Sequence, residues 1–555
     1  MSFLNLKNFW LSIKHDRFLL LALLVGLLLR GLNSTFGSPS LYISNDEAIA
    51  HLSAFNMIAA KTPVSIANYT PLGAYLQIPF LFASYLAIKI LGYVQNVSDF
   101  ELFILTHEGY FLFIPRLISA FFGTLTILVV YKTTLYLFQE KQAAILAAFL
   151  TAVSFNLVHI SHLGRPWSPA LFFMTASVYF ALRRQVFLSF ITCATAYGFH
   201  QSGILIMPLI LLLTNKVEKF KILYSFLFFT LIVFILSLLT LRAGLIDSVK
   251  SGQSFLRSGE LVVDVISKNF SFPGSVVNTV ADNLSLYFLE NFLITDGIIL
   301  IFGILGLSLS YGKNKKLFLF IACYFFFASL FFHPLIRYLL PIYILLIPFS
   351  GYALLIVSRR NGYLIPILIL LASINSLWWN YLYLKKPSFI QAREWLIKNI
   401  NSDVPIAYTG TRYRMFLPNS ESIAYTQIFR KDFYSELFKF GPSNSMDNVR
   451  NIVYTSVFPG DTKLDKLNKA IGNYHIVYVV DYYIDPSERL YDLDPGKFNI
   501  VAHFNPVIND MITGIPEPLF DSSWNFPIND NRPKLSMYSL SNTGPYFEIL
   551  KIKNY

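Results

Sequence analysis

Residues 363–387 read YLIPILILLASINSLWWNYLYLKKP, and they divide the chain into two parts of different composition. The apolar run at the start of this stretch is long enough to cross a bilayer. The aromatic residues 378–383, followed by two lysines, are typical of a membrane–water interface. Similar apolar runs precede the stretch, whereas the residues after it alternate polar and apolar side chains. The sequence therefore predicts a membrane part, residues 1–386, and a soluble part, residues 387–555.

The composition of the whole chain supports this division. Of the 555 residues, 55% are hydrophobic and only 14% are charged, as expected of an integral membrane protein. The net charge of +12 does not indicate a nucleic-acid partner, because the basic residues lie in short loops between apolar runs, where they determine topology. Cys193 and Cys323 both fall inside apolar runs, so we expect no disulfide framework.

The apolar runs and the basic loops together predict about eleven transmembrane helices. The short basic loops share one side with a cytoplasmic N-terminus only if the run 186–214 crosses twice, turning near residues 198–203. The run 72–93 then makes no single crossing, and we expect it to be interfacial or re-entrant. The remaining spans are expected at 17–33, 111–137, 143–160, 169–182, 221–241, 290–310, 317–332, 336–357 and 363–381.

This topology places two long loops, 34–110 and 242–289, on the outer side together with the soluble part. Loops of that length are usually functional. In the soluble part, Ser388 and Gln391 have the spacing of a capping box that opens a helix over 389–399. Strand-like runs at 405–408, 475–480, 499–504 and 547–552 complete a predicted extracytoplasmic α/β domain.

The acids of the first outer loop are the main catalytic candidates. Asp46 or Glu47 could take a proton from an attacking hydroxyl as a general base. Glu47 and His51 have the spacing that places two ligands on one helix face, and this half-site would suit a divalent Mg, Mn or Zn ion. The alternative is a solvated helix face. Glu108 is a further acid near the end of a span.

Three arginines, Arg116, Arg165 and Arg337, lie at the predicted outer ends of spans, against the usual bias of positive charge. A phosphate group at the outer leaflet would explain all three, since guanidinium binds phosphate in a bidentate fork. The alternative is snorkelling to lipid headgroups. His159 and His162 share one helix face, where they either act in a site or bond to the end of a helix. The chain has no phosphate-binding glycine loop and no nucleophile elbow, so ATP-driven transport and serine-type hydrolysis have no support.

Several motifs occur in an order that resembles a known family, the polyprenyl-phosphate-dependent glycosyltransferases of the GT-C fold. The most similar groups are the protein O-mannosyltransferases and the lipid A aminoarabinose transferases. The motifs are Asp46-Glu47 after the first span, Tyr69-Thr70-Pro71-Leu72, the run PRLISAFFGTLT at 115–126, Arg337-Tyr338-Leu339-Leu340-Pro341 and AREWL at 392–396.

The resemblance implies an inverting transfer from an undecaprenyl- or dolichyl-phosphate sugar to a protein, lipid or glycan acceptor in contact with membrane lipids. Asp46 would be the base, with Glu47 beside it, and a divalent metal sometimes assists. The carrier phosphate would be bound by Arg116, Arg165, Arg337 and Tyr338. The substrates would also contact Tyr69, His51, His162 and Glu108.

Two other classes of function remain open at this point. A lipid-linked glycan flippase or exporter would carry charged residues deep within its spans. An O-antigen ligase or polymerase would lack both the Asp-Glu pair in the first outer loop and the soluble tail.

Overall fold

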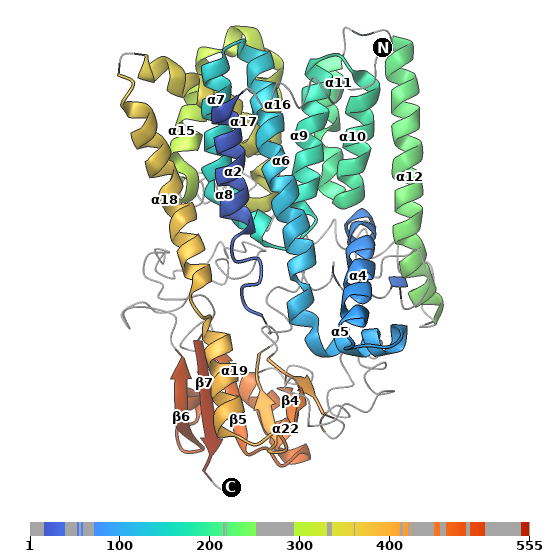
Figure 1. Ribbon diagram of the computed structural model, residues 1–555, viewed down its shortest axis with the longest axis vertical. Coiled ribbons are helices and arrows are strands. Elements are labelled where there is room, and N and C mark those ends of the chain that lie inside the picture. Colours follow the sequence, from blue (N-terminus) through green and yellow to red (C-terminus); the bar gives the residue numbers. More distant parts are fainter. Residues whose placement is uncertain are drawn as a thin grey trace, which may run out of the picture.

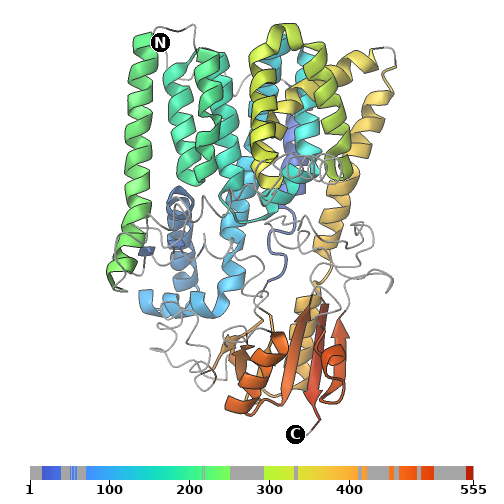
Figure 2. The same ribbon diagram turned by 180° about the vertical axis from the view of Figure 1, so that it is seen from behind.

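A computed structural model describes residues 16–38, 51, 53–54, 57–58, 71–214, 217, 219–250, 293–329, 336–359, 361–410, 415–419, 422, 449–455, 462–483, 489–504 and 546–553. These residues form a helical bundle and a small sheet at one end of it (Figure 1). Seen from behind, the sheet lies at the same end, below the last long helix of the bundle (Figure 2).

The bundle follows the apolar runs of the sequence closely. Its helices are α2 (Arg17–Gly31), α6 (Phe113–Phe138), α7 (Lys141–Val153), α8 (Phe155–His162), α9 (Trp167–Leu182), α10 (Val186–Phe199), α11 (Met207–Thr214), α12 (Lys219–Lys250), α15 (Leu293–Leu309), α16 (Tyr311–Ser329), α17 (Ile336–Ser358) and α18 (Leu364–Leu384).

Five helices within the described part are long and apolar enough to cross a membrane, or six if the bent pair α7 and α8 is one span. Four further apolar helices are shorter. The integral membrane nature of the chain is thus confirmed, while the number eleven and the cytoplasmic N-terminus stay predictions. The run 186–214 forms two helices, α10 and α11, joined by the 3-10 turn Gln201–Ile206, as the expected double crossing requires.

The run 143–160 was expected to form one span, and the structure shows a bend within it that the sequence did not predict. The run is broken at Ser154, and the axes of α7 and α8 differ by 49°. The run 72–93 forms α4 (Leu72–Ile90), which stands upright below α10 with α5 (Val97–Phe111) crosswise beneath it (Figure 1). A Cβ on Gly198 would meet Leu72 at 2.3 Å, so α4 begins where α10 ends. Its interfacial or re-entrant placement stays a prediction.

The soluble part is an α/β unit, as predicted. Its five-stranded sheet has the order β4 (Ile452–Tyr454), β1 (Ile406–Tyr408), β5 (Tyr478–Tyr483), β7 (Tyr546–Ile552) and β6 (Phe498–Phe504). The pairs β4–β1 and β1–β5 are parallel, and β5–β7 and β7–β6 are antiparallel. The two-residue strands β2 (Leu417–Pro418) and β3 (Val449–Arg450) pair separately, and helices α22 (Lys463–Asn473) and α23 (Leu490–Leu493) complete the unit.

Helix α19 (Ser388–Asn399) connects the bundle to the sheet and packs against β6 and β7. The capping box expected at its start is wrong. Pro387 is the N-cap and makes no side-chain cap bond, and Gln391 instead donates to the carbonyl of Lys386 at 2.8 Å. The ring of Pro387 fixes the φ angle of this residue. No side chain of the N-cap residue bonds to the start of the helix.

Small side chains allow the centre of the bundle to pack closely. Helix α7 presents buried alanines, and a Cβ on Gly351 of α17 would meet the carbonyl oxygen of Ala143 at 2.5 Å and the amide nitrogen of Ala147 at 2.7 Å. Such close backbone contact is how helices associate in a membrane, where apolar lipid gives no hydrophobic drive.

We predict that Gly351→Leu lowers the stability of the folded protein by about 1–3 kcal/mol or more, because the new side chain has no space against the α7 backbone. Thermal unfolding of the detergent-solubilised protein measures this change. Gly312→Leu is the matched control, since a Cβ there meets no atom within 4 Å. Equal unfolding temperatures for the two variants would contradict the close packing of α7 and α17.

Candidate active site

The break at Ser154 leaves the last carbonyls of α7 without helical partners, and side chains from two other helices bond to them. Arg30 of α2 donates to the carbonyls of Thr151 and Ala152 at 2.7 and 2.8 Å. The hydroxyl of Ser376 in α18 donates to the carbonyl of Val153 at 2.7 Å. Because a bilayer supplies no water, these bonds are what makes an interrupted helix tolerable at this depth.

Asp296 completes the other side of the break. Its carboxylate accepts from the amides of Phe155 and Asn156 at 2.8 and 3.0 Å, and from the hydroxyl of Ser154 at 2.9 Å. Asp296 itself sits at a kink in α15, with φ −137° and ψ 37°. It therefore caps the N-terminus of α8 from a distant part of the chain, where the helix dipole favours a negative charge.

Helix α8 carries two histidines, of which His162 faces the chain leaving α2 and His159 faces α18. The ring nitrogens of His162 lie 3.0 Å from the carbonyl of Val158 and 3.2 Å from that of Leu32. A neutral imidazole donates from only one of its two ring nitrogens, so in that form the ring donates to one of these two carbonyls. His159 Nδ1 lies 3.4 Å from the hydroxyl of Tyr383, at the end of α18.

Arg116 of α6 holds the segment 32–38 that follows α2. Its guanidinium donates to the carbonyls of Ser34 and Phe36 at 3.0 and 2.8 Å and lies 4.1 Å from the centre of the Phe36 ring. Phe36 in turn stacks on Tyr383, with ring centres 4.1 Å apart. The buried arginine thus holds the backbone of the segment 32–38 against α6.

Arg165 lies in the buried turn between α8 and α9, which is tied to α6. The hydroxyl of Ser119 donates to the Arg165 carbonyl at 2.8 Å, and Ser168 donates to the Ser119 carbonyl at 2.9 Å. A Cβ on Gly123 would meet the Ser161 hydroxyl at 2.2 Å, so α6 and α8 approach closely. Arg165 is close enough to His159, and Arg116 to His162, to act on them electrostatically.

The structure therefore brings together three of the predicted site residues, Arg116, His162 and Arg165, at one end of the bundle. His51 is buried and pairs through Nδ1 with the Gln77 side chain at 2.8 Å, so it lies against α4. Asp46, Glu47 and Tyr69 lie outside the described residues. Glu108, Arg337 and Tyr338 lie in described helices, but their side chains are outside the described part. Their functional roles stay predictions.

Four residues of this region were not among the sequence candidates: Arg30, Asp296, Tyr343 and Tyr383. A charged residue within an apolar run is a signal for a functional or structural role, and Arg30 and Asp296 both carry it. These two buried charges are the kind that a flippase would need within its spans. Their contacts are with helix ends, however, so they do not point to a translocation path.

The described residues contain no group of three or more His, Cys, Asp or Glu side chains that could hold a metal ion. Since Nδ1 of His51 faces Gln77, a metal would have to bind this ring through Nε2. The expected metal half-site with Glu47 stays a prediction.

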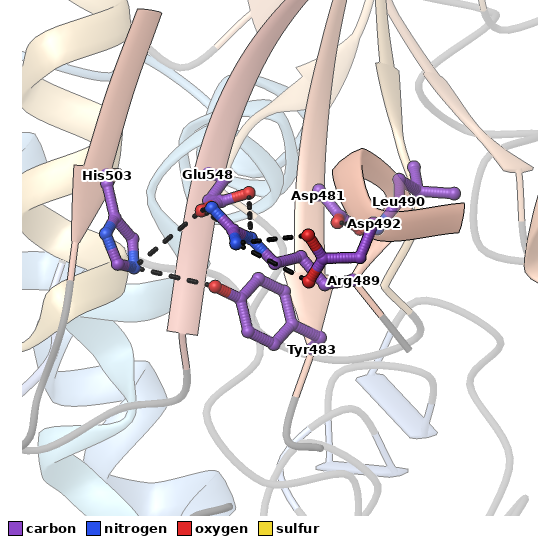
Figure 3. A network of polar contacts seen from close by, with 7 residues as sticks. All are labelled: Asp481, Tyr483, Arg489, Leu490, Asp492, His503 and Glu548. Carbon is purple, nitrogen blue, oxygen red and sulfur yellow. Dashed lines mark hydrogen bonds and ion pairs between the residues drawn. The ribbon is translucent and has the colours of Figure 1, made fainter. Parts of the chain in front are cut away.

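A second polar cluster lies in the soluble part, and Figure 3 shows it. Glu548 on β7 faces Asp481 on β5 and His503 on β6, and both acids are fully buried. Arg489 binds both oxygens of Glu548 through Nε at 2.9 Å, and Lys463 binds Asp481 at 2.5 Å. Hydrogen bonds to Glu548 raise the pKa of Arg489 above its usual range. Each buried acid thus has its own cation, which indicates a structural role.

The comparisons with known proteins agree with the membrane part of this description. Residues 106–197 match the family model described as dolichyl-phosphate-mannose-protein mannosyltransferase. This range holds Arg116, His162 and Arg165. A comparison with curated proteins finds no match.

Two of the solved structures that are similar to this chain come from an archaeon and a bacterium. The oligosaccharyltransferase of Archaeoglobus fulgidus, in complex with zinc and sulfate, is 16% identical, with a TM-score of 0.45 over 84% of this chain and 68% of that one. ArnT of Cupriavidus metallidurans, bound to undecaprenyl phosphate, is 14% identical, with a TM-score of 0.46 over 89% of this chain and 96% of that one.

The fold defines a class: a polytopic helical membrane protein with a C-terminal α/β unit, as the sequence predicted. The resemblance to polyprenyl-phosphate-dependent glycosyltransferases is confirmed by the match over residues 106–197. The match supports a membrane glycosyltransferase.

We predict that Arg489→Gln destabilises the soluble part by about 3 kcal/mol, because it leaves the carboxylate of Glu548 buried without its cation. Chemical denaturation followed by circular dichroism measures the loss. Lys386→Gln is the control: it breaks an exposed ion pair with Glu394 and should cost at most about 1 kcal/mol. Equal losses would mean that the buried pair adds no more than a surface pair.

Proposed function

We propose that this protein transfers a sugar from a polyprenyl-phosphate carrier to a hydroxyl group of a protein, lipid or glycan on the outer face of the membrane. One observation carries the proposal. Arg116, His162 and Arg165 lie buried at the same end of the bundle, around the segment 32–38 that leads to Asp46 and Glu47. All three belong to the stretch matched by the mannosyltransferase family.

The proposed reaction uses this arrangement in a single displacement. Asp46 takes the proton from the acceptor hydroxyl, and the oxygen attacks the anomeric carbon from the face opposite the carrier. The bond between that carbon and the phosphate oxygen breaks, so the sugar is inverted and the polyprenyl phosphate leaves with the negative charge. Glu47 orients the base or the acceptor.

The basic residues would stabilise the charge that develops on the leaving phosphate. A buried cation is effective there, because little water screens it. Arg116 donates its hydrogen bonds to the carbonyls of Ser34 and Phe36. We therefore assign it an electrostatic stabilisation of the phosphate rather than a hydrogen bond to it. Arg165 sits on the buried turn, and Arg337 and Tyr338 at the start of α17 are assigned to the same group.

The remaining assignments complete the proposal. Tyr69, His51, His162 and Glu108 are assigned to contacts with the substrates. If a divalent ion takes part, Glu47 and His51 would hold it, and it would add positive charge near the phosphate. The carrier is an undecaprenyl or dolichyl phosphate, the N-terminus is cytoplasmic and the α/β unit lies outside.

We predict that Asp46→Asn lowers sugar transfer by at least about 100-fold, the usual contribution of a general base, because the amide cannot accept the proton. The measurement is transfer by the purified protein from a panel of radiolabelled undecaprenyl- and dolichyl-phosphate sugars to membrane acceptors. Asp403→Asn, at an exposed site of the soluble part, is the matched control and should retain wild-type transfer.

Transfer that survives in Asp46→Asn within a few-fold of the wild type would contradict the assignment of the base. Absence of transfer by the wild type from every carrier of the panel would contradict the proposed donor class.

A further inference from the structure

We propose that Arg30 and Asp296 are positioning residues that set the direction of α8 from the two sides of the Ser154 break. The claim about the direction of α8 rests on the geometry of the break alone. Only the expected effect on ligand binding rests on the proposed function.

Arg30 joins α2 to α7 at the break. It is 1% exposed, and it donates to a carbonyl of its own helix, Gly26, at 3.1 Å, as well as to Thr151 and Ala152 of α7. A Cβ on Gly26 would meet Ile127 of α6 at 2.2 Å, so the glycine lets α2 approach α6 closely. The guanidinium thus holds the carbonyl end of α7, where the helix dipole favours a positive charge.

Asp296 makes the matching contacts at the amide end of α8. Besides the bonds from Ser154, Phe155 and Asn156, its carboxylate accepts from the Asn156 side chain at 2.7 Å and bonds to the Tyr343 hydroxyl. The Asn156 side chain also donates to the Thr295 hydroxyl at 2.9 Å. The carboxylate therefore fixes both the end of α8 and its rotation about the helix axis.

The charges of Arg30 and Asp296 stabilise the bend more than neutral capping groups would. Arg30 and Asp296 bond to opposite sides of the break. Each also carries the sign that its helix end prefers, so straightening the span would separate both charges from their partners. Buried charges with several bonds each hold one geometry, because any other leaves a charge unpaired in a dry interior.

Helix α8 connects the Ser154 break to the candidate site, and the distance between the two is short. Its eight residues extend roughly 12 Å, so a change of about 10° in its direction moves the Arg165 turn by roughly 2 Å. Displacements of about 1 Å in a catalytic arrangement can cost 100-fold in rate. Trp379 of α18 reports the same movement, because its ring packs edge-on against Phe155 and His159 at 5.8 and 5.4 Å.

The first test is the fluorescence of Trp379 in the full-length protein. The difference between spectra with and without Trp379→Phe isolates this residue from the other tryptophans. Asp296→Asn keeps the size of the side chain but removes the charge, and we expect it to shift the Trp379 emission. Ser350→Ala removes a buried hydroxyl that joins α15 to α17, the helices that carry Asp296 and Tyr343. The hydroxyl bonds to the Ile299 carbonyl at 2.7 Å. This variant should leave the emission unchanged.

Binding of undecaprenyl phosphate, measured by tryptophan-independent thermophoresis, is the second readout. We expect about tenfold weaker binding in Asp296→Asn and wild-type binding in Ser350→Ala. If the wild type binds neither undecaprenyl phosphate nor dolichyl phosphate, the proposed function fails, but the emission of Trp379 still tests the positioning role.

Two results would overturn the inference. The first is an unchanged Trp379 emission in Asp296→Asn. The second is an equal shift in Ser350→Ala, because it would mean that loss of any buried polar bond between these helices changes the surroundings of Trp379. If Asp296→Asn does not fold, Arg30→Lys replaces it. That variant keeps the charge but loses the two-carbonyl fork, and it should shift the emission in the same way. No shift there would count against the proposal.

Discussion

A helix that breaks inside a membrane exposes carbonyls on one side of the break and amides on the other, and each needs a partner. At Ser154 the described residues supply all of them. The Leu150 carbonyl accepts from the Ser154 amide, and the next three accept from Arg30 and Ser376. The first amides of α8 donate to Asp296 and to Ser154 itself. Because these bonds fix the bend, they also fix where His162 and Arg165 lie, and the candidate site depends on them.

The membrane part of the fold could be predicted because apolar length and basic loops are local properties. Strands β1, β5, β6 and β7 of the soluble part were predicted on the same grounds, whereas β4 and the two-residue strands β2 and β3 were not. The break at Ser154 was missed because the apolar run continues through it. Its partners are distant in sequence: Arg30 lies 121 and 122 residues from the carbonyls that it binds, and Asp296 lies 140 to 142 residues from its donors.

The candidate site could also be predicted only in part: some of its residues could be named from the sequence, but their contacts could not. Arginines at the outer ends of spans were visible in the sequence, and the structure brings Arg116 and Arg165 to one end of the bundle with His162. Their contacts were not visible. Arg116 holds the backbone of Ser34 and Phe36 rather than facing open solvent, and the turn at Arg165 is tied to α6 through Ser119. The arrangement depends on close helix contacts at Gly123, which a pattern of residue types does not reveal.

The most direct measurement is the attachment site of a polyprenyl phosphate analogue that carries a photoreactive group next to its phosphate. Mass spectrometry of the labelled protein identifies the peptides that the phosphate end contacts. The account predicts labelling of residues 32–38 and of the α8–α9 region, 155–168, with loss of label when excess undecaprenyl phosphate competes. Competed labelling confined to the soluble part or to α12 would contradict a carrier site at the end of α8.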